Sequence, residues 1–138
     1  MMPRLFREAP VNPIWEGSGN VQCLDVLRAM AKTPAVIDAF FAEASKAQGT
    51  HVALDQWIAA LAKDLRDVRD IEYRARDLVD RMALALQASL LVRHAPAFVS
   101  DAFCQSRLAQ LGHHNYGTLP RGVDVNAIIA RATPQSGA

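Results

Sequence analysis

Hydrophobic positions recur every three to four residues along most of this 138-residue chain. This spacing is typical of amphipathic α-helices, and β-branched residues do not cluster in the alternating pattern of strands. No glycine lies between Gly49 and Gly112, and no proline lies between Pro34 and Pro96. Because the middle of the chain lacks the two residues that disfavour helix most, the pattern predicts an all-α protein.

Cap residues divide this pattern into separate helices. The first predicted helix follows Ser18 and the second follows Thr33-Pro34. The others span about 52–67, 70–93, 96–111 and 125–132. Gly49 and Gly112 are placed as C-terminal stops, and Asp124 as the N-cap of the last helix. Residues 66–70 contain no helix breaker, so the pattern leaves open whether the third and fourth helices are continuous.

Helices joined by short links favour an antiparallel bundle, which we expect over residues 21–134, followed by a polar tail at 135–138. Residues 1–20 differ because they contain three prolines and the Gly17-Ser18-Gly19 turn. We therefore expect an irregular N-terminal leader there. The large apolar residues of this leader need a surface to pack against, and we expect that the bundle alone does not supply all of it. These residues are Leu5, Phe6, Val11, Ile14 and Trp15.

The composition narrows the class of protein. Charged residues make up 21% of the chain and the net charge is +1, which excludes a disordered polyelectrolyte and gives no bulk attraction to nucleic acid or acidic membranes. Cys23 and Cys104 are too few for a disulfide scaffold, which favours the cytoplasm. No apolar run reaches the roughly 20 residues of a membrane span, and the start lacks the apolar segment of a signal peptide.

One segment, residues 11–20, has a pattern that suggests chemistry. Glu16 lies between Trp15 and a glycine turn, directly before a helix start. The indole would desolvate the carboxyl group and raise its pKa toward the range of a general base. Gly17 and Gly19 allow close approach of a ligand, and the following amides suit a polar or anionic cofactor group. An ordinary capped helix with a solvent-facing Glu16 fits the same residues and is the more common case.

The run Ile14-Trp15-Glu16-Gly17-Ser18 resembles the Tyr-Glu-Gly-Thr signature at the catalytic base of acyl-CoA dehydrogenases. Val21-Gln22 and Arg28 stand where that family commonly has Ile-Gln and Arg. The longer string from Arg7 to Arg28, with Trp15, Ser18 and Cys23 in place of the commoner Tyr, Thr and Arg, resembles the alkylation-response (AidB-type) branch. The resemblance is specific over about residues 4–32 and looser in the later helices.

The resemblance implies that the chain is the C-terminal helical portion of an FAD-dependent enzyme. Glu16 would remove the α-proton of an acyl-CoA thioester while the β-hydride passes to the flavin. The residues that would line the FAD and substrate side are Trp15, Gly17, Ser18, Gly19 and Asn20. The family holds FAD between two helical domains and a β-domain, and this sequence has no β-domain candidate and no glycine-rich dinucleotide loop.

We therefore expect this chain alone to bind no FAD and to be inactive, with the missing domains as its partners in a homotetramer. The competing hypothesis is a free-standing helical interaction module that keeps the motif as a relic.

The resemblance also implies DNA binding through the C-terminal helices, for which the candidates are Arg28, Arg66, Arg69 and Arg76. If one helix runs through residues 66–76, then Arg66, Arg69, Tyr73 and Arg76 share a face, although Asp80 lies there too. A solvated face with Asp–Arg pairs is the alternative and fits the balanced charge better.

No metal site is predicted. His113-His114 lies in a predicted loop, and His94 and Cys104 lie on unrelated helix faces.

Overall fold

The computed structural model describes residues 2–14, 18–109 and 117–134, and these residues form helices without any strand. The α-helices are α1 (Met2–Glu8), α2 (Ser18–Lys32), α3 (Ala35–Ala44), α4 (Val52–Arg66), α5 (Ala75–His94), α6 (Ala97–Phe103) and α7 (Val125–Ala132). The all-α prediction is confirmed, whereas the antiparallel arrangement of the bundle stays a prediction. Within the described ranges, no helix is both long and apolar enough to cross a membrane.

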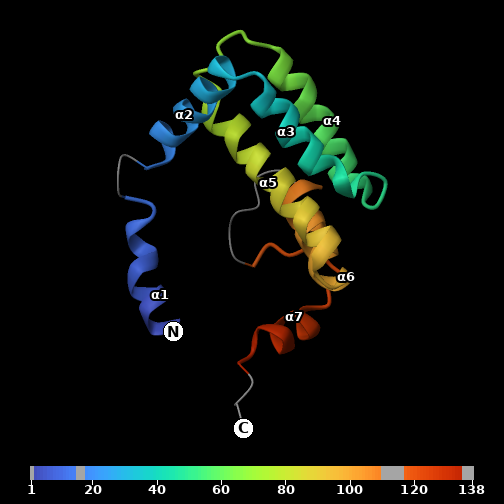
Figure 1. The fold of residues 1–138 in the computed structure, drawn as a ribbon. Helices are drawn as coiled ribbons and strands as arrows, with labels where there is room; N and C mark the ends of the chain where they lie inside the picture. The colour runs from blue at the N-terminus through green and yellow to red at the C-terminus, as the bar shows by residue number, and fades with distance from the viewer. Residues whose placement is uncertain (1, 15–17, 110–116, 135–138) are drawn as a thin grey trace.

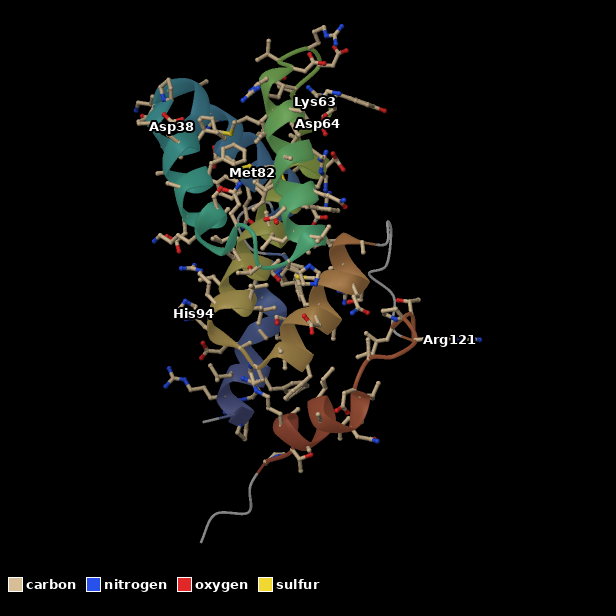
Figure 2. All side chains as sticks on the ribbon, turned by 90° about the vertical axis from the view of Figure 1, so that its right-hand side faces the viewer. Asp38, Lys63, Asp64, Met82, His94 and Arg121 are labelled. Carbon is tan, nitrogen blue, oxygen red and sulfur yellow. The ribbon has the colours of Figure 1, made fainter. Side chains whose placement is uncertain are left out.

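The central element is α5, which contacts α2, α3, α4 and α6 (Figure 1). Its buried positions face two apolar clusters. Leu61, Leu65, Leu78 and Ala85 form one, and Ala47, Leu54, Leu84, Ala88, Cys104 and Leu108 form the other. Met82 of α5 packs against the first cluster and lies between α3 and α4 (Figure 2). Burial of these side chains, at about 25 cal/mol per Å² of apolar surface, is the main force that holds the helices together.

The helices α4 and α5 are separate. After Arg66 the backbone becomes extended at Asp67, and Asp70 adopts a positive φ of 49°. The guanidinium of Arg74 donates to the carbonyl oxygens of Asp64 (3.3 Å), Asp67 and Arg69 (3.0 Å). Of these three residues only Asp64 lies in α4, and its carbonyl also accepts from the Asp67 amide at 3.3 Å. Because the last carbonyls of a helix have no partner within it, Arg74 supports both the end of α4 and the connection that follows.

The prediction of an irregular leader is wrong for residues 2–11, which form α1 and a short 3-10 turn, Ala9–Val11. Proline is tolerated in the first turn of a helix, where its missing N–H has no partner to lose, so Pro3 does not prevent α1. The Arg4 guanidinium pairs with Glu8 at 3.3 Å, four residues later. In Figure 1, α1 lies apart from α5. Its apolar side chains are therefore largely exposed, with Phe6 79% exposed.

The predicted helix over 96–111 changes geometry in its second half. The α-helical part, α6, ends at Phe103 and continues as a π-helical turn, Cys104–Leu108. The wider turn buries Cys104, Ser106 and Leu108 together, and the Ser106 hydroxyl donates to the Ala102 carbonyl at 2.6 Å. The predicted stop at Gly112 lies outside the described residues. The cap of the last helix is confirmed, because the Asp124 carboxylate accepts from the Ala127 amide at 2.9 Å.

Candidate functional site

The predicted site lies partly beyond what the structure describes. Trp15, Glu16 and Gly17 fall outside the described residues, and of Ser18 only the backbone, at the start of α2, is described. The two remaining predicted positions, Gly19 and Asn20, are described in full. The geometry of the site can therefore be built from the first turn of α2 and from what packs against it.

The first turn of α2 is held by a residue from α5. The backbone of α2 is non-helical at Gly19, which marks a kink. A Cβ at Gly19 would lie 2.9 Å from Nη2 of Arg76, closer than real Cβ contacts come, so the guanidinium would have to shift if residue 19 had a side chain. Nη1 of Arg76 also donates to the Asn20 side-chain oxygen at 3.0 Å. The start of α2 and the start of α5 are thereby joined.

A hollow of about 300 Å³ opens beside this contact. Asn20, Cys23 and Leu24 line it from α2, and Glu72, Tyr73, Ala75 and Arg76 line it from the α4–α5 connection and α5. Cys23 is 8% exposed and forms the floor, as expected for a cysteine acting as a small apolar residue. Tyr73 is 93% exposed. The hollow therefore brings one cation, one carboxylate and one phenol to the first turn of α2.

The described residues do not form a complete site for FAD. Small-molecule sites usually measure about 300–1,000 Å³, and this hollow lies at the lower limit for ligands far smaller than a dinucleotide. The Asn20 side-chain oxygen is already engaged by Arg76. The described residues around Gly19 and Asn20 therefore do not enclose a dinucleotide.

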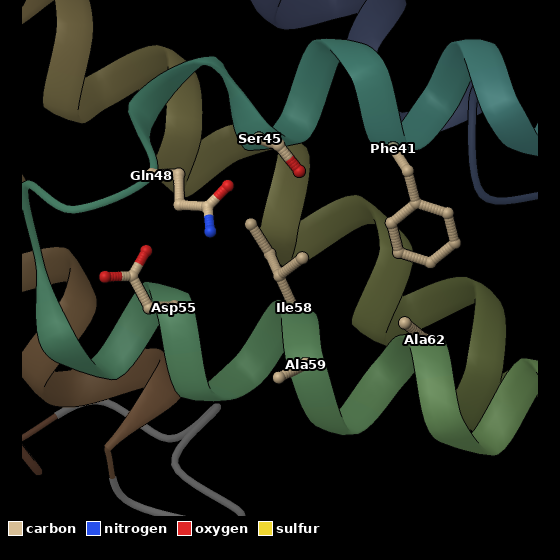
Figure 3. A pocket seen from close by; sticks show the side chains of 7 residues that line it. All are labelled: Phe41, Ser45, Gln48, Asp55, Ile58, Ala59 and Ala62. Atoms are coloured by element: carbon tan, nitrogen blue, oxygen red, sulfur yellow. The ribbon is translucent and has the colours of Figure 1, made fainter.

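A second groove lies between α3 and α4 (Figure 3). It has a volume of about 230 Å³, and Phe41 from α3 and Ile58 from α4 form its apolar part. Asp55 lies at one end near Gln48. Its carboxylate accepts from the Gly49 amide at 3.1 and 3.2 Å, so it holds the turn before α4.

The arginines predicted to contact DNA do not share a helix face. The premise of one helix over 66–76 is wrong, because Arg66 ends α4, Arg69 lies in the connection and Arg76 lies in α5. Arg69 pairs with Asp67 through two contacts of 2.8 and 2.7 Å, and Arg28 pairs with Asp25 on α2. This is the solvated Asp–Arg pairing that the charge balance favoured. DNA binding itself stays a prediction.

The titratable groups with shifted pKa values lie away from the hollow beside α2. Hydrogen bonds from the Arg69 side chain and backbone hold the pKa of the Asp67 carboxyl well below its usual range. Hydrogen bonds from Lys46 and Arg93 lower the pKa of Glu43. Burial raises the pKa of the Cys104 thiol to about 11, which keeps it protonated and unreactive. These shifts follow from structural pairs and burial, and none of these groups lines the hollow at α2.

A metal centre is also not found in the part of the chain that the structure covers. No three His, Cys, Asp or Glu side chains converge among the described residues. His113 and His114 lie outside them. Both cysteines are free and buried.

The sequence interpretation missed the role of Arg76 at the start of α2. Arg76 and Asn20 are 56 residues apart, and neither periodicity nor motif spacing reports a contact over that distance. Arg76 was instead grouped with Arg66 and Arg69 on a helix face that does not exist. The only hint in the sequence is Gly19 itself, because a glycine inside a helical pattern often marks a close approach by another group.

Comparison with known proteins supports the motif-based resemblance. No family model matches the chain. Over 111 residues, 80% of the chain, it is 34% identical to AidB of Escherichia coli (strain K12), an acyl-CoA dehydrogenase-like protein. The match far exceeds the motif-bearing segment of residues 4–32, so it includes most of the helices. The chain spans only 20% of the length of that relative. The resemblance predicted from the segment around Glu16, to the C-terminal region of an acyl-CoA dehydrogenase of the AidB type, is thereby confirmed.

Proposed function

We propose that this chain acts as the C-terminal helical portion of an FAD-dependent acyl-CoA dehydrogenase of the AidB type. The observation that carries the proposal is the 34% identity to AidB over 80% of the chain, in a sequence that contains the Trp15-Glu16-Gly17-Ser18 signature. The chain contributes the base and one edge of the cofactor site. It does not contribute the enclosure of the flavin.

The chemical task of the chain is proton removal. The Glu16 carboxylate accepts the proton from the carbon next to the thioester carbonyl of an acyl-CoA. Trp15 provides an apolar neighbour that raises the basicity of this carboxylate. FAD, when bound, supplies the acceptor for the hydride that leaves the neighbouring carbon. Gly19 and Asn20 keep the first turn of α2 at the edge of that site.

The exposed apolar surface of the N-terminal region supports the presence of a partner. Leu5, Phe6 and Ile14 are 55%, 79% and 75% exposed, and they follow one another closely along the chain. Such surfaces on a soluble domain usually mark an interface. Since the chain spans only 20% of AidB, the natural cover is the remaining polypeptide of such an enzyme. We place the complete enzyme in the cytoplasm as a homotetramer.

A link to alkylation damage and DNA is the second part of the proposal, and it rests on the AidB resemblance alone. Arg28 and Arg69 already have acidic partners, so phosphate contact would have to displace them. Duplex binding measured across salt concentrations tests this part. Binding through phosphates weakens steeply with salt, and affinity that is insensitive to salt excludes this mechanism.

The experiment that tests the catalytic proposal replaces the matching segment of E. coli AidB with this chain. We expect the chimera to retain FAD and to lose its flavin colour when an acyl-CoA is added without oxygen. The matched variant Glu16→Gln keeps the shape of the side chain but cannot accept a proton. It should retain FAD and keep its colour. A folded chimera without FAD, or a Glu16→Gln chimera that is reduced as fast as the parent, contradicts the proposal. The first result would favour the free-standing interaction module.

A further inference from the structure

We propose that Arg76 is a positioning residue, which fixes the first turn of α2, the helix that follows the segment that carries Glu16. The importance of this position for catalysis rests on the function proposed above. The contact itself does not, because it is formed wholly by described residues. Neither the sequence motif nor the comparison with AidB assigns this role to Arg76.

The Arg76 guanidinium contacts the start of α2 at two residues, Gly19 and Asn20, and we call this pair of contacts the clamp. Nη1 of Arg76 donates to Asn20 at 3.0 Å, and Nη2 lies 2.9 Å from the position that a Cβ of residue 19 would take. A planar guanidinium can pack against the backbone of a glycine and at the same time donate a hydrogen bond within its own plane to a neighbouring oxygen. A Cβ at residue 19 would therefore force the Arg76 guanidinium, the end of a flexible side chain, to shift. Replacing either residue should remove the same contact.

The other end of the clamp is rigid. Arg76 follows Ala75, which is 3% exposed, and α5 is anchored again by Leu78, which is fully buried. The preceding connection is held by Arg74 through three carbonyl oxygens. The backbone of Arg76 is therefore fixed from both sides, and its side chain can transmit that order to α2. Glu16 precedes Gly19 by only three residues along the chain.

The test uses the full chain labelled with 5-fluorotryptophan and observed by ¹⁹F NMR. The chain contains two tryptophans, Trp15 beside Glu16 and Trp57 in the bundle, and the variant Trp57→Phe assigns the two signals. We expect Arg76→Ala and Gly19→Ala each to shift the Trp15 signal and to leave the Trp57 signal unchanged. The unchanged Trp57 signal shows that the bundle remains folded. Arg66→Ala, at the end of α4, is the matched control and should move neither signal.

The double variant Gly19→Ala, Arg76→Ala decides between a shared contact and two local effects. If both single variants break one clamp, the double variant shifts the Trp15 signal no further than either of them. The conservative variant Arg76→Lys keeps a donor for Asn20 and should return part of the shift. A Trp15 signal that is the same in the parent and in Arg76→Ala, or shifts that add in the double variant, overturns the proposal.

The two proposals fail in different ways. Shared, non-additive Trp15 shifts together with a Glu16→Gln chimera that stays fully active would keep the clamp and overturn the proposed catalytic function. Additive or absent shifts together with an inactive Glu16→Gln chimera would keep the catalytic function and overturn the clamp.

Discussion

Trp57 and Arg81 contact each other twice. The Trp57 indole nitrogen donates to the Arg81 carbonyl oxygen at 3.0 Å, and the Arg81 guanidinium carbon lies 5.6 Å from the centre of the indole ring. The same guanidinium pairs with Asp64 at 2.6 Å and Asp77 at 3.4 Å. With its side chain only 18% exposed, Arg81 joins α4 to α5 through charge, hydrogen bonding and ring contact together.

Replacing Trp57 by phenylalanine tests how much these contacts between Trp57 and Arg81 stabilise the fold. The variant keeps an aromatic ring but loses the hydrogen bond to Arg81 and the larger face of the indole. We expect Trp57→Phe to lower the free energy of unfolding in urea by about 1–2 kcal/mol. Gln56→Ala, at an exposed neighbouring position, is the control and should stay within about 0.5 kcal/mol of the parent. Equal stability of Trp57→Phe and the parent would show that these contacts do not contribute.

Arg74 offers a second test, directed at the α4–α5 connection. Arg74→Met keeps the length and apolar stem of the side chain but removes the donors to three carbonyl oxygens. Because hydrogen bonds from charged donors are among the stronger ones, we expect a loss of about 2 kcal/mol and faster amide hydrogen exchange over residues 67–75. Arg69→Ala removes an exposed pair and should cost about 0.5 kcal/mol at most. Similar effects of the two variants would contradict this role of Arg74.

The dependence of stability on pH should change when Glu43 is replaced. Hydrogen bonds from Lys46 and Arg93 lower the pKa of Glu43 from its ordinary value of 4.5. A carboxyl group with a lowered pKa in the folded state stabilises the fold above the unfolded value and loses this contribution as the pH falls through the folded value. We expect Glu43→Gln to reduce the melting temperature at pH 7 and this difference to shrink on acidification below pH 4.5. A difference that stays constant down to pH 2, or a Glu72→Gln control that behaves alike, would count against this explanation.

The thiol of Cys104 should be unreactive in the folded chain. It is fully buried, and its pKa of about 11 leaves almost no thiolate at pH 8. In a Cys23→Ser variant, where Cys104 is the only thiol, we expect no labelling by a disulfide reagent at pH 8 until urea unfolds the chain. Rapid labelling under native conditions would show that the π-helical turn opens freely.

The exposed N-terminal side chains should make the chain self-associate when no other polypeptide covers them. Phe6 is 79% exposed, so Phe6→Asp should leave the melting temperature unchanged while it shifts sedimentation toward the monomer. The control is Val68→Asp, at a similarly exposed apolar residue on the α4–α5 connection. If both variants or neither change the sedimentation, self-association does not use the leader.

Local signals in the sequence were sufficient for most helices. The apolar periodicity located the bundle helices, and the Asp124 cap marked the start of α7 correctly because both depend on neighbours within one or two turns. The end of α4 was harder to locate because no glycine or proline marks it. Arg74, which donates to the Asp64 carbonyl, lies ten residues further along the chain. The π-helical turn at Cys104 was not predicted because periodicity assumes a constant 3.6 residues per turn.

The sequence shows the candidate site only as a motif. The segment around Glu16 suggested a base beside a helix start, and the comparison with AidB supports the family. The contact of Arg76 with Gly19 and Asn20 could not be read from the sequence, because it depends on how α5 packs against α2. The grouping of Arg76 with Arg66 and Arg69 failed for the same reason, since it assumed a helix where the chain turns.

In the connection between α4 and α5, the carbonyl oxygens of Asp67 and Arg69 accept from Arg74, while Val68 and Tyr73 are 72% and 93% exposed. These backbone contacts do not involve the side chains of Val68 and Tyr73. We therefore expect substitutions at these two positions to change the outer surface of the loop more than its path.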